Sequence, residues 1–400
     1  VDAEQRARPQ TQEEYLDTLR ECLDLAPRPK PEVEGLPFTG GLVGVSGYDV
    51  VRLFEKLPRE ATPQTTVPDA AFVAPTSLLV FDHLTRRVAV LHDGPEYERQ
   101  RLRKEVIERL RGHVPRTGDK IETSDAVGSL SEQEFCDRVD TCKEYIAAGD
   151  IYQIVVSVLF KGRSNVPPFE VYRALRLLNP SPYMFYFDFG EQKVVGSSPE
   201  ALVRLNDGTA SLRPIAGTLP RGDTPEEDRD NEQKLLADPK EAAEHVMLVD
   251  LARNDLGRVA SAGSIHVDPY RAIERYSHVM HIVSGVQGEL APTHDQFDLF
   301  AASFPAGTLV GAPKVRAMEI IESLEPVGRG LYAGTAGYFG LTGDMDQAIT
   351  IRTLVFSGDE YSFQAGAGIV ADSVPAREYQ EVLAKSAILR RALEIAGEGL

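Results

Sequence analysis

The order of apolar and polar positions predicts helices and strands that follow one another in blocks. Apolar residues recur with helical spacing over residues 11–25, and a charged helix is expected at about 95–112. Apolar, β-branched runs between turn formers predict strands at 70–82, 87–92, 150–160, 183–189, 192–197, 201–205, 209–213, 333–341, 347–356 and 361–371. The hairpin-length turns between them favour an α+β fold with antiparallel sheets over alternating βαβ units.

End signals mark several more helices. Ser131 and Glu134 have the spacing of a capping box, and the helix that they open is expected to end at Gly149. Further helices are predicted at four places: after Pro168, over about 239–256, after Pro313 and after Pro375. The charged segment 219–239 is expected to be a loop.

Residues 113–130 are polar and rich in turn formers, which makes them the best candidate for a boundary. We therefore expect a β-rich N-terminal portion over residues 1–125. Residues 126–400 are expected to form a catalytic portion that packs as one intimate unit. The chain of 400 residues is long enough for two average domains or one large one.

The composition is that of an acidic, soluble globular protein. Apolar residues make up 42% and charged residues 26% of the chain, and the net charge is −18. This charge argues against nucleic acid and anionic membranes as partners, and no apolar run approaches the ~18 residues of a membrane span. Cys22, Cys136 and Cys142 show no C-x-x-C spacing, so buried thiols in a reducing cytoplasm are expected. The sequence opens without Met or a signal peptide and is expected to be processed or truncated there.

A glycine-rich strand end that leads into a charged helix is the first candidate site. Gly366 and Gly368 precede a turn, and Glu378, Glu381 and Lys385 then share one face of the predicted helix. Carboxylates and a lysine beside bare backbone can seat an anion that is held through a metal ion. Taken alone, such a stripe is more often a solvated helix face.

A second acidic pair, Glu241 and Glu244, stands near the start of the helix predicted at 239–256. Acidic residues at this place often only complement the helix dipole. This helix is largely apolar, however, and its pair repeats the spacing of Glu378 and Glu381. Two desolvated carboxylate pairs need a cation, and oxygen ligands shared with an anionic substrate suit Mg²⁺.

Three further positions could contact a ligand. Residues 303–314 look like a P-loop, but Val315 stands where Ser or Thr is required, so we expect no nucleotide there, whereas a carboxylate could bind the free backbone N–H groups. Arg352 is predicted within one continuous apolar strand, where a bound anion or a buried partner would explain it. His281, read alone, is typical of a hydrogen-bonded core histidine.

Eight segments, in order along the chain, carry a resemblance to a known family. They are GDIYQIVVS, NPSPYMFYF, SSPEALVRL, RPIAGTLPRG, DPKEAAEHVMLVDLARNDLG, SFPAGTLVGAPK, DQAITIRT and AGAGIVADS with its following Glu, Glu and Lys. With these the chain resembles the chorismate-utilising enzymes, most closely the large component of anthranilate synthases, from Leu36 onward. The resemblance implies large antiparallel sheets that pack together, with helices on the outside.

The resemblance also implies which residues bind. Four glutamates would lie at Mg²⁺, which would be held against the ring carboxylate of chorismate: Glu244 and Glu381 as ligands, with Glu241 and Glu378 close by. Five positions would hold the enolpyruvyl carboxylate: Tyr332, Arg352, Lys385, Gly366 and Gly368. Thr308 would lie beside the ring.

Glu200 matches the general acid that protonates the departing C4 hydroxyl, a step that is needed because hydroxide is a poor leaving group. His281 matches a histidine that faces the ring and acts in the later elimination, and Thr218 also faces the substrate. The implied reaction is Mg²⁺-dependent amination of chorismate at C2 and loss of pyruvate to give anthranilate, the first step of tryptophan biosynthesis. Ammonia would come from a glutamine amidotransferase subunit in a cytoplasmic hetero-oligomer, since no cysteine here sits in a glycine-flanked nucleophile elbow.

Two positions discriminate among relatives. Family members that add water carry a lysine base where Gln153 stands, and an amide cannot deprotonate water, so ammonia is the expected nucleophile. Ala216 stands where para-aminobenzoate-type synthases carry a lysine nucleophile, which disfavours that alternative. A 2-amino-2-deoxyisochorismate synthase, which stops before pyruvate is lost, stays open. The joint presence of the matching residues argues against a subunit that binds without turnover; they are Glu200, Glu244, Glu381, Arg352 and Lys385.

The chain departs from the family at two places. Ser157-Val158-Leu159 replaces the usual serine-glutamine-arginine, which we interpret as a change in packing. The chain also starts downstream of a leucine-rich segment that forms half of an inhibitory tryptophan site. The other half is present as Asn179, Pro180, Pro182, Tyr183 and Met184. Feedback inhibition by tryptophan is therefore expected to be weak or absent.

Overall fold

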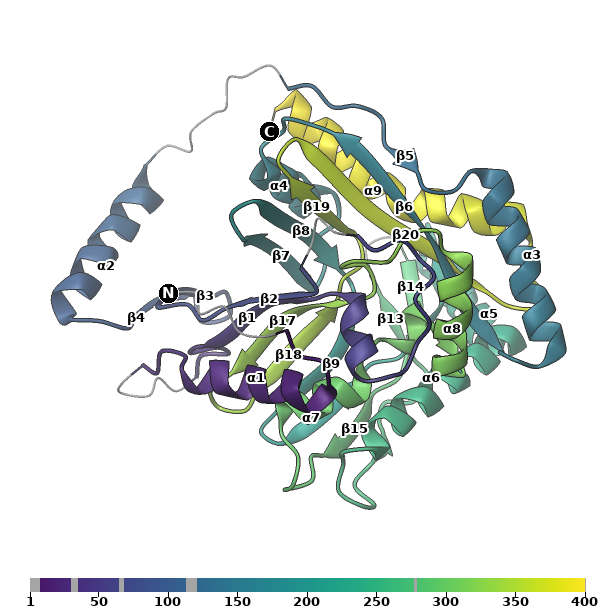
Figure 1. Cartoon of the computed structure of the whole chain (residues 1–400), viewed down its shortest axis with the longest axis horizontal. Helices are drawn as coiled ribbons and strands as arrows, with labels where there is room; N and C mark the ends of the chain where they lie inside the picture. The colour runs from purple at the N-terminus through teal and green to yellow at the C-terminus, as the bar shows by residue number, and fades with distance from the viewer. Residues whose placement is uncertain (1–7, 30–34, 65–67, 113–120, 277–278, 400) are drawn as a thin grey trace.

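The computed structural model describes residues 8–29, 35–64, 68–112, 121–276 and 279–399. In this part of the chain two large antiparallel sheets lie one above the other (Figure 1). The eight-stranded sheet has the order β12 (His266–Val267), β15 (Val286–Glu289), β10 (Thr209–Leu212), β9 (Ala201–Asn206), β18 (Met345–Ile349), β17 (Thr335–Gly340), β1 (Gly41–Ser46) and β2 (Ala70–Val73). The seven-stranded sheet has the order β16 (Gly311–Ala312), β6 (Gln153–Arg163), β20 (Glu360–Ile369), β19 (Thr353–Ser357), β8 (Gln192–Ser198) and β7 (Tyr183–Asp188), with β5 (Val127–Gly128) beside β6.

Two smaller sheets accompany them. The first, called the small sheet below, has the order β11 (Ile215–Pro220), β14 (Val279–Val283) and β13 (Ala272–Arg275). The second is a hairpin of β3 (Ser77–Asp82) and β4 (Arg87–His92). The predicted pairing of residues 70–82 with 87–92 is thus confirmed for β3 and β4, while β2 pairs with β1.

Most of the helices that flank the two large sheets bury apolar side chains against them. The seven-stranded sheet is flanked by α3 (Glu132–Ala148), α4 (Pro168–Leu178) and α9 (Pro375–Glu398). The eight-stranded sheet is flanked by α1 (Gln12–Asp24), α6 (Pro239–Gly257) and α7 (Gln296–Ser303). The remaining helices are α8 (Lys314–Leu324) beside β6, α5 (Pro225–Ala237) beside the small sheet, α2 (Glu96–Arg111) beside β4, and the short 3₁₀ helices η1 (Tyr48–Leu53) and η2 (Gly307–Leu309).

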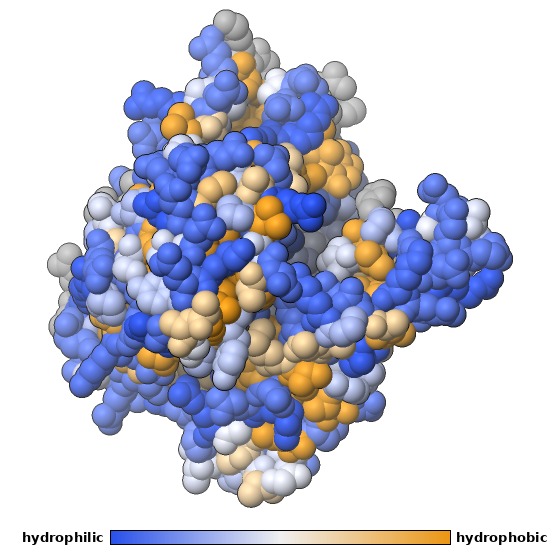
Figure 2. Space-filling model, turned by 90° about the vertical axis from the view of Figure 1, so that its right-hand side faces the viewer, coloured by the Kyte–Doolittle hydropathy of each residue, from blue (hydrophilic) through white to orange (hydrophobic). Residues whose placement is uncertain are grey.

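One large hydrophobic cluster joins both large sheets and most helices, with members such as Leu42, Val156, Phe300, Leu354 and Leu389. Burying each such side chain contributes about 1.5–3 kcal/mol. The helix α7 is buried along its whole length, beneath α1. On the face where α3 and α5 lie, hydrophilic residues cover most of the surface and hydrophobic residues form small separate patches (Figure 2).

The predicted α+β class and the capping box of α3 are confirmed. The prediction of a loop over 219–239 is wrong, because Thr224 and Glu227 form a second capping box that opens α5, with Pro225 in its first turn. The three cysteines are free, as expected, and Cys142 is buried. No helix among the described residues is long and apolar enough to cross a membrane. The division at residue 125 stays a prediction.

Candidate active site

Two crossovers between the large sheets lie side by side, and each carries a charged residue of the candidate site. Strand β8 of the seven-stranded sheet leads into β9 of the eight-stranded sheet through Glu200, and β18 leads back to β19 through Arg352. The N–H of Ile349 donates to the carbonyl of Glu200 at 3.0 Å, and the N–H of Ser197 donates to the carbonyl of Arg352 at 3.1 Å. Glu200 and Arg352 therefore lie at neighbouring points where the chain passes from one sheet to the other.

The prediction that Arg352 lies within one continuous strand is wrong. The predicted strand 347–356 is two strands, and Arg352 stands in the break with a φ of +49°. This left-handed conformation is rare for residues other than glycine, costs on the order of 1–3 kcal/mol and gathers at functional sites. Because apolar residues stand on both sides of the break, the sequence pattern does not reveal it.

Glu200 has the environment of a proton donor. Burial raises the pKa of its carboxyl to about 6, although a hydrogen bond from Thr308 and the charges of Arg352 and Lys385 act in the opposite direction. Thr308, on η2, donates from Oγ1 to Oε1 of Glu200 at 2.9 Å. A carboxyl with this pKa is partly protonated near neutral pH, as a general acid requires.

Cationic and backbone groups line the part of the site next to Glu200. Lys385, on α9, donates to the carbonyl of Gly366 at 3.0 Å and pairs with Glu381 at 2.7 Å. A Cβ at Gly366 would lie 2.8 Å from both the Tyr332 hydroxyl and the Val156 carbonyl, so only glycine fits there. Burial lowers the pKa of Arg352, which still stays charged as arginines do. Two of the predicted anion-binding residues, Lys385 and Tyr332, thus lie beside Gly366.

The four predicted metal ligands form two pairs, each within the first two turns of a helix. On α6, Oε1 of Glu244 accepts a hydrogen bond from Gln153 at 3.2 Å, and burial together with the charge of Glu244 raises the pKa of Glu241. On α9, burial raises the pKa of Glu378, and the charge of Glu381 adds to this shift. Lys240, beside Glu241 in the chain, acts electrostatically on Glu378, so the two helix starts approach each other.

The donor set fits Mg²⁺ better than a metal that needs a closed cage. Among the described residues no group of three or more His, Cys, Asp or Glu side chains could by itself hold a metal ion. Mg²⁺ keeps several waters and is held through one or two carboxylates together with groups of the substrate. The raised pKa values of Glu241 and Glu378 also show carboxylates that a bound cation would stabilise. Shared binding of one ion by Glu244 and Glu381 stays a prediction.

The small sheet brings Thr218 and His281 together. The two residues are direct cross-strand partners, at a register shift next to Gly217, and Gly217 has a φ of +67°. Nδ1 of His281 lies 3.0 Å from both Oγ1 of Thr218 and the carbonyl of Gly217. Because a carbonyl can only accept, Nδ1 carries the proton, which leaves Nε2 as a proton acceptor in the neutral ring. A Cβ on Gly217 would lie 3.0 Å from Oε2 of Glu241, so this sheet also adjoins the carboxylates.

The five residues of the predicted half-site for tryptophan follow α4 and open β7. Oγ of Ser197, on β8, donates to the carbonyl of Asn179 at 2.5 Å, and the N–H of Ser197 holds the carbonyl of Arg352. Burial raises the pKa of Tyr183, and the charge of Asp346 adds to this shift. One β8 residue thus connects this half-site to the crossover at Arg352, and tryptophan binding itself stays a prediction.

A buried ion pair that sequence reasoning missed supports the site. Arg329 binds both carboxylate oxygens of Glu325, at 2.7 and 2.9 Å, and their side chains are 1% and 3% exposed. Arg329 also donates to the carbonyls of Val155 and Leu309, which belong to the elements that carry Gln153 and Thr308. Its guanidinium lies over the ring of Tyr332, 5.6 Å from the centroid.

Ser157, which keeps the serine of the family motif just before the departure at Val158 and Leu159, belongs to the same network. Its N–H and Oγ donate to Glu325 at 2.8 and 2.7 Å, and Gln364 donates to its Oγ at 2.8 Å. The arginine–glutamate spacing of i, i+4 was the only available signal, and it is common in exposed helices.

Comparisons with known proteins identify the family. The family model described as chorismate binding enzyme matches residues 1–391. Anthranilate synthase component 1 of Aquifex aeolicus is 48% identical over 378 residues, which cover 91% of this chain and 76% of that protein. The Pseudomonas aeruginosa protein of the same name is 47% identical over 387 residues, covering 92% of this chain and 78% of that protein.

Solved structures give the same result. Anthranilate synthase component I from Streptococcus pneumoniae superposes with a TM-score of 0.84 at 38% identity, over 94% of this chain and 85% of that one. The menaquinone-specific isochorismate synthase of Escherichia coli shares the fold, with a TM-score of 0.72 at 24% identity over 97% of this chain and 84% of that one. The chain therefore belongs to the family of chorismate binding enzymes.

Proposed function

We propose that this chain is the aminating component of an anthranilate synthase, which converts chorismate and ammonia into anthranilate, pyruvate and water. The observation that carries this assignment is a proton donor, Glu200 with a pKa of about 6, placed beside the cationic residues Arg352 and Lys385. The names of the relatives support the same reaction. Incubation of the chain with chorismate, Mg²⁺ and ammonium tests it, since the fluorescence of anthranilate should appear and depend on all three.

Binding uses both carboxylates of the substrate. Arg352, Lys385 and the Tyr332 hydroxyl hold the enolpyruvyl carboxylate against the bare backbone at Gly366 and Gly368, because arginine and lysine in a buried site bind carboxylates strongly. Burial raises the pKa of Tyr332 to about 12, so its hydroxyl stays protonated and can donate.

The four glutamates at the starts of α6 and α9 face the ring carboxylate, with Glu244 and Glu381 as the residues that would hold Mg²⁺. When bound there, Mg²⁺ supplies stabilisation of the negative charge at the ring carboxylate. The cofactor is a proposal that a titration can test: chorismate-dependent turnover should require Mg²⁺ in the parent chain, and Glu381→Gln should raise the concentration needed.

The chemistry proceeds in two stages. Ammonia forms a bond to C2 while the bond from C4 to its hydroxyl breaks, and Glu200 delivers the proton that lets the oxygen leave as water. The C2 proton is then removed and the bond from C3 to the enolpyruvyl oxygen breaks, which makes the ring aromatic and releases pyruvate. His281 presents Nε2 as a proton acceptor for this second stage.

The choice of ammonia over water rests on Gln153. Its amide donates to Glu244 and cannot act as the base that water would need. Ala216, on β11, offers no amine for covalent catalysis and disfavours amination at C4. A synthase that releases 2-amino-2-deoxyisochorismate is the alternative, and mass spectrometry of the product separates the two, since only one route gives anthranilate.

Ammonia is supplied by a second polypeptide, which we propose to be a glutamine amidotransferase. The relatives are named as component 1, which implies a second component. In the cell the chain would then work as a hetero-oligomer in the cytoplasm, and free ammonia would replace the partner in vitro. Hydrolysis of glutamine by the isolated chain would contradict this division of labour.

A further inference from the structure

The small sheet carries Thr218 and His281 but, within the described residues, forms no ladder with either large sheet. It contacts the rest of the protein through α5 and α6. Its own hydrophobic cluster has three buried members, which are Leu235 of α5 together with Met280 and Ile282 of β14. So small a cluster fixes position poorly, and polar contacts therefore matter more for the orientation of His281.

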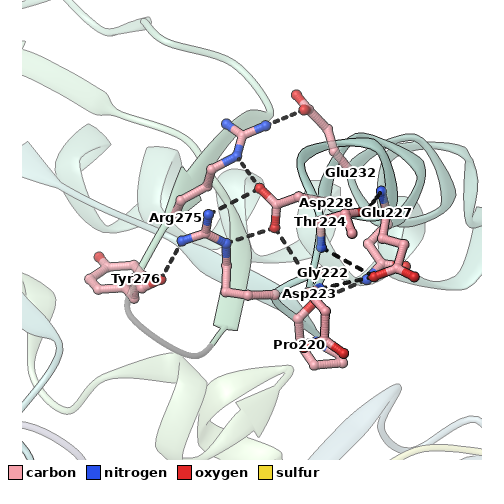
Figure 3. Close-up of polar contacts among 11 residues, drawn as sticks. Pro220, Gly222, Asp223, Thr224, Glu227, Asp228, Glu232, Arg275 and Tyr276 are labelled. Atoms are coloured by element: carbon pink, nitrogen blue, oxygen red, sulfur yellow. Dashed lines mark hydrogen bonds and ion pairs between the residues drawn. The ribbon is translucent and has the colours of Figure 1, made fainter.

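Asp228, on α5, is the centre of a polar cluster at one end of this sheet (Figure 3). Its carboxylate accepts two hydrogen bonds from Arg221, at 2.7 and 3.1 Å, one from the N–H of Gly222 at 3.0 Å and one from Nε of Arg275 at 3.1 Å. Arg275 in turn pairs with Glu232, one turn further along α5. Four hydrogen bonds fill the capacity of a carboxylate. A single side chain thus joins α5 to the ends of β11 and β13.

The cluster is closely built. A Cβ on Gly222 would lie 2.3 Å from the backbone N of Asp228, so the segment after β11 crosses directly over the first turn of α5. The hydrogen bonds from Arg221 and Gly222 hold the pKa of Asp228 well below its usual range. The carboxylate is therefore ionised throughout the pH range in which the enzyme works.

Two short paths lead from this cluster to His281. Nη1 of Arg221 donates to the carbonyl of Tyr276 at 2.8 Å, and the Tyr276 ring meets the His281 ring edge-on, with centroids 5.6 Å apart. The Tyr276 hydroxyl donates to Glu274, and Glu274 is the direct cross-strand partner of His281. Through Tyr276, Arg221 and Asp228 therefore connect to both neighbours of His281, the Tyr276 ring and the cross-strand residue Glu274.

We propose that Asp228 is a positioning residue for the reaction, which acts through Arg221 and Tyr276 to hold the His281 ring in its productive orientation. The inference depends on the role proposed above for His281. In this proposal α5, which packs against the small sheet, contributes to catalysis through Asp228. A misplacement of about 1 Å can slow a reaction by about 100-fold, so a small movement of this sheet would be visible in the rate.

The test compares Asp228→Asn with Asp230→Asn. Both substitutions remove one negative charge from α5, but the Asp230 side chain is exposed, whereas Asp228 lies at the centre of the cluster. We expect Asp228→Asn to lower kcat by about 10- to 100-fold with the KM for chorismate unchanged, and Asp230→Asn to change neither. The side-chain ¹⁵N resonances of His281, assigned with a His281→Asn variant, should shift in Asp228→Asn alone, measured well below the unfolding transition.

Two results would overturn the inference: an unchanged kcat in Asp228→Asn, or a lowered kcat with the His281 resonances unmoved. If Asp228→Asn does not fold, Arg221→Lys replaces it, because one ammonium group can pair with Asp228 but cannot also hold the Tyr276 carbonyl in the geometry of the guanidinium fork. It should give the same loss of kcat and the same shift. Anthranilate formation by the parent chain and by Asp230→Asn reports on the proposed function separately.

Discussion

Two arginine–carboxylate pairs support two parts of the proposed site, and they differ in depth. The side chains of Arg329 and Glu325 are 1% and 3% exposed, within the main core. Those of Arg221 and Asp228 are 34% and 12% exposed, at the end of the small sheet. Each arginine binds its carboxylate twice and also donates to a backbone carbonyl near a site residue. The same chemistry thus orients side chains at both places.

Because the two pairs differ in depth, we expect loss of the Arg329–Glu325 pair to affect mainly folding and loss of the Arg221–Asp228 pair to affect mainly catalysis. A buried pair cannot lose one partner without leaving a charge stranded in the core, so the side of the site with Thr308 and Tyr332 is inseparable from the fold. A pair whose arginine is partly open to water, like Arg221 and Asp228, contributes less to stability than a fully buried pair, because water screens part of its charge. The side with His281 can therefore change its orientation while the rest of the protein stays folded.

The largest expected effect is at Glu200, on the buried side. Glu200→Gln keeps the shape and the contact with Thr308 but removes the proton donor, so kcat should fall by about 10²- to 10⁴-fold while chorismate still binds. On the small sheet, Thr218→Val should cost less than tenfold, since the Gly217 carbonyl still orients His281. Steady-state kinetics and chorismate titration measure both, and equal losses would contradict the division between the two sides.

Glu325→Ala should have the next largest effect, on stability. It leaves Arg329 unpaired in the core and should lower the free energy of unfolding by about 3–5 kcal/mol. Glu319→Ala, on the helix α8 that ends just before Glu325, is the matched control, because Glu319 and its partner Arg316 are 38% and 41% exposed and such pairs contribute about 0–1 kcal/mol. Chemical denaturation of both variants gives the comparison, and similar losses would show that burial is not what distinguishes the pairs.

Much of the fold could be predicted from the sequence because local signals specify it. Amphipathic spacing, capping residues and hairpin turns located α1, α3, α4, α6 and strands β7 to β10. The helix α5 was missed although Thr224 and Glu227 gave the correct capping signal, because its charged sequence lacks a marked apolar stripe. Because α5 was not predicted, the polar cluster around Asp228 was not predicted either.

The candidate site could be proposed from the sequence as a set of residues, but its geometry could not. Glu200, Arg352 and the two acidic pairs were identified from motifs, and the structure shows that the charges of Arg352 and Lys385 act on Glu200 while Lys385 pairs with Glu381. Neither crossover between the sheets could be foreseen, since Arg352 stands in an apolar run that looks like one strand. Burial of Arg329 with Glu325 arises from elements far apart in the sequence, and no local pattern encodes it.

Gln153→Lys should have a moderate effect, and it tests the role of Gln153 on the buried side of the site. A lysine ammonium at this place would pair with Glu244, which now accepts a hydrogen bond from Gln153, and would compete with Mg²⁺. Ammonia-dependent turnover should fall by about tenfold or more, which corresponds to about 1.4 kcal/mol, and water should then compete as the nucleophile. Product analysis by mass spectrometry would detect hydroxylated product, and unchanged amination kinetics would count against the assigned role. Gln153→Asn, which keeps an amide, is the control.

Thr308→Val should have the smallest effect, a change in pH dependence. The Thr308 hydroxyl donates to the Glu200 carboxylate and so favours its charged form, which holds the pKa lower than burial alone would. Without that hydroxyl the pKa of Glu200 should rise above about 6, and since only the protonated form donates, the rate should persist to higher pH. Profiles of kcat/KM for chorismate at constant free ammonia measure this shift. Thr308→Ser keeps a hydroxyl and should leave the alkaline limb in place, whereas an acid limb that moves to higher pH in Thr308→Val, with the alkaline limb unmoved, would mean that Glu200 acts as a base.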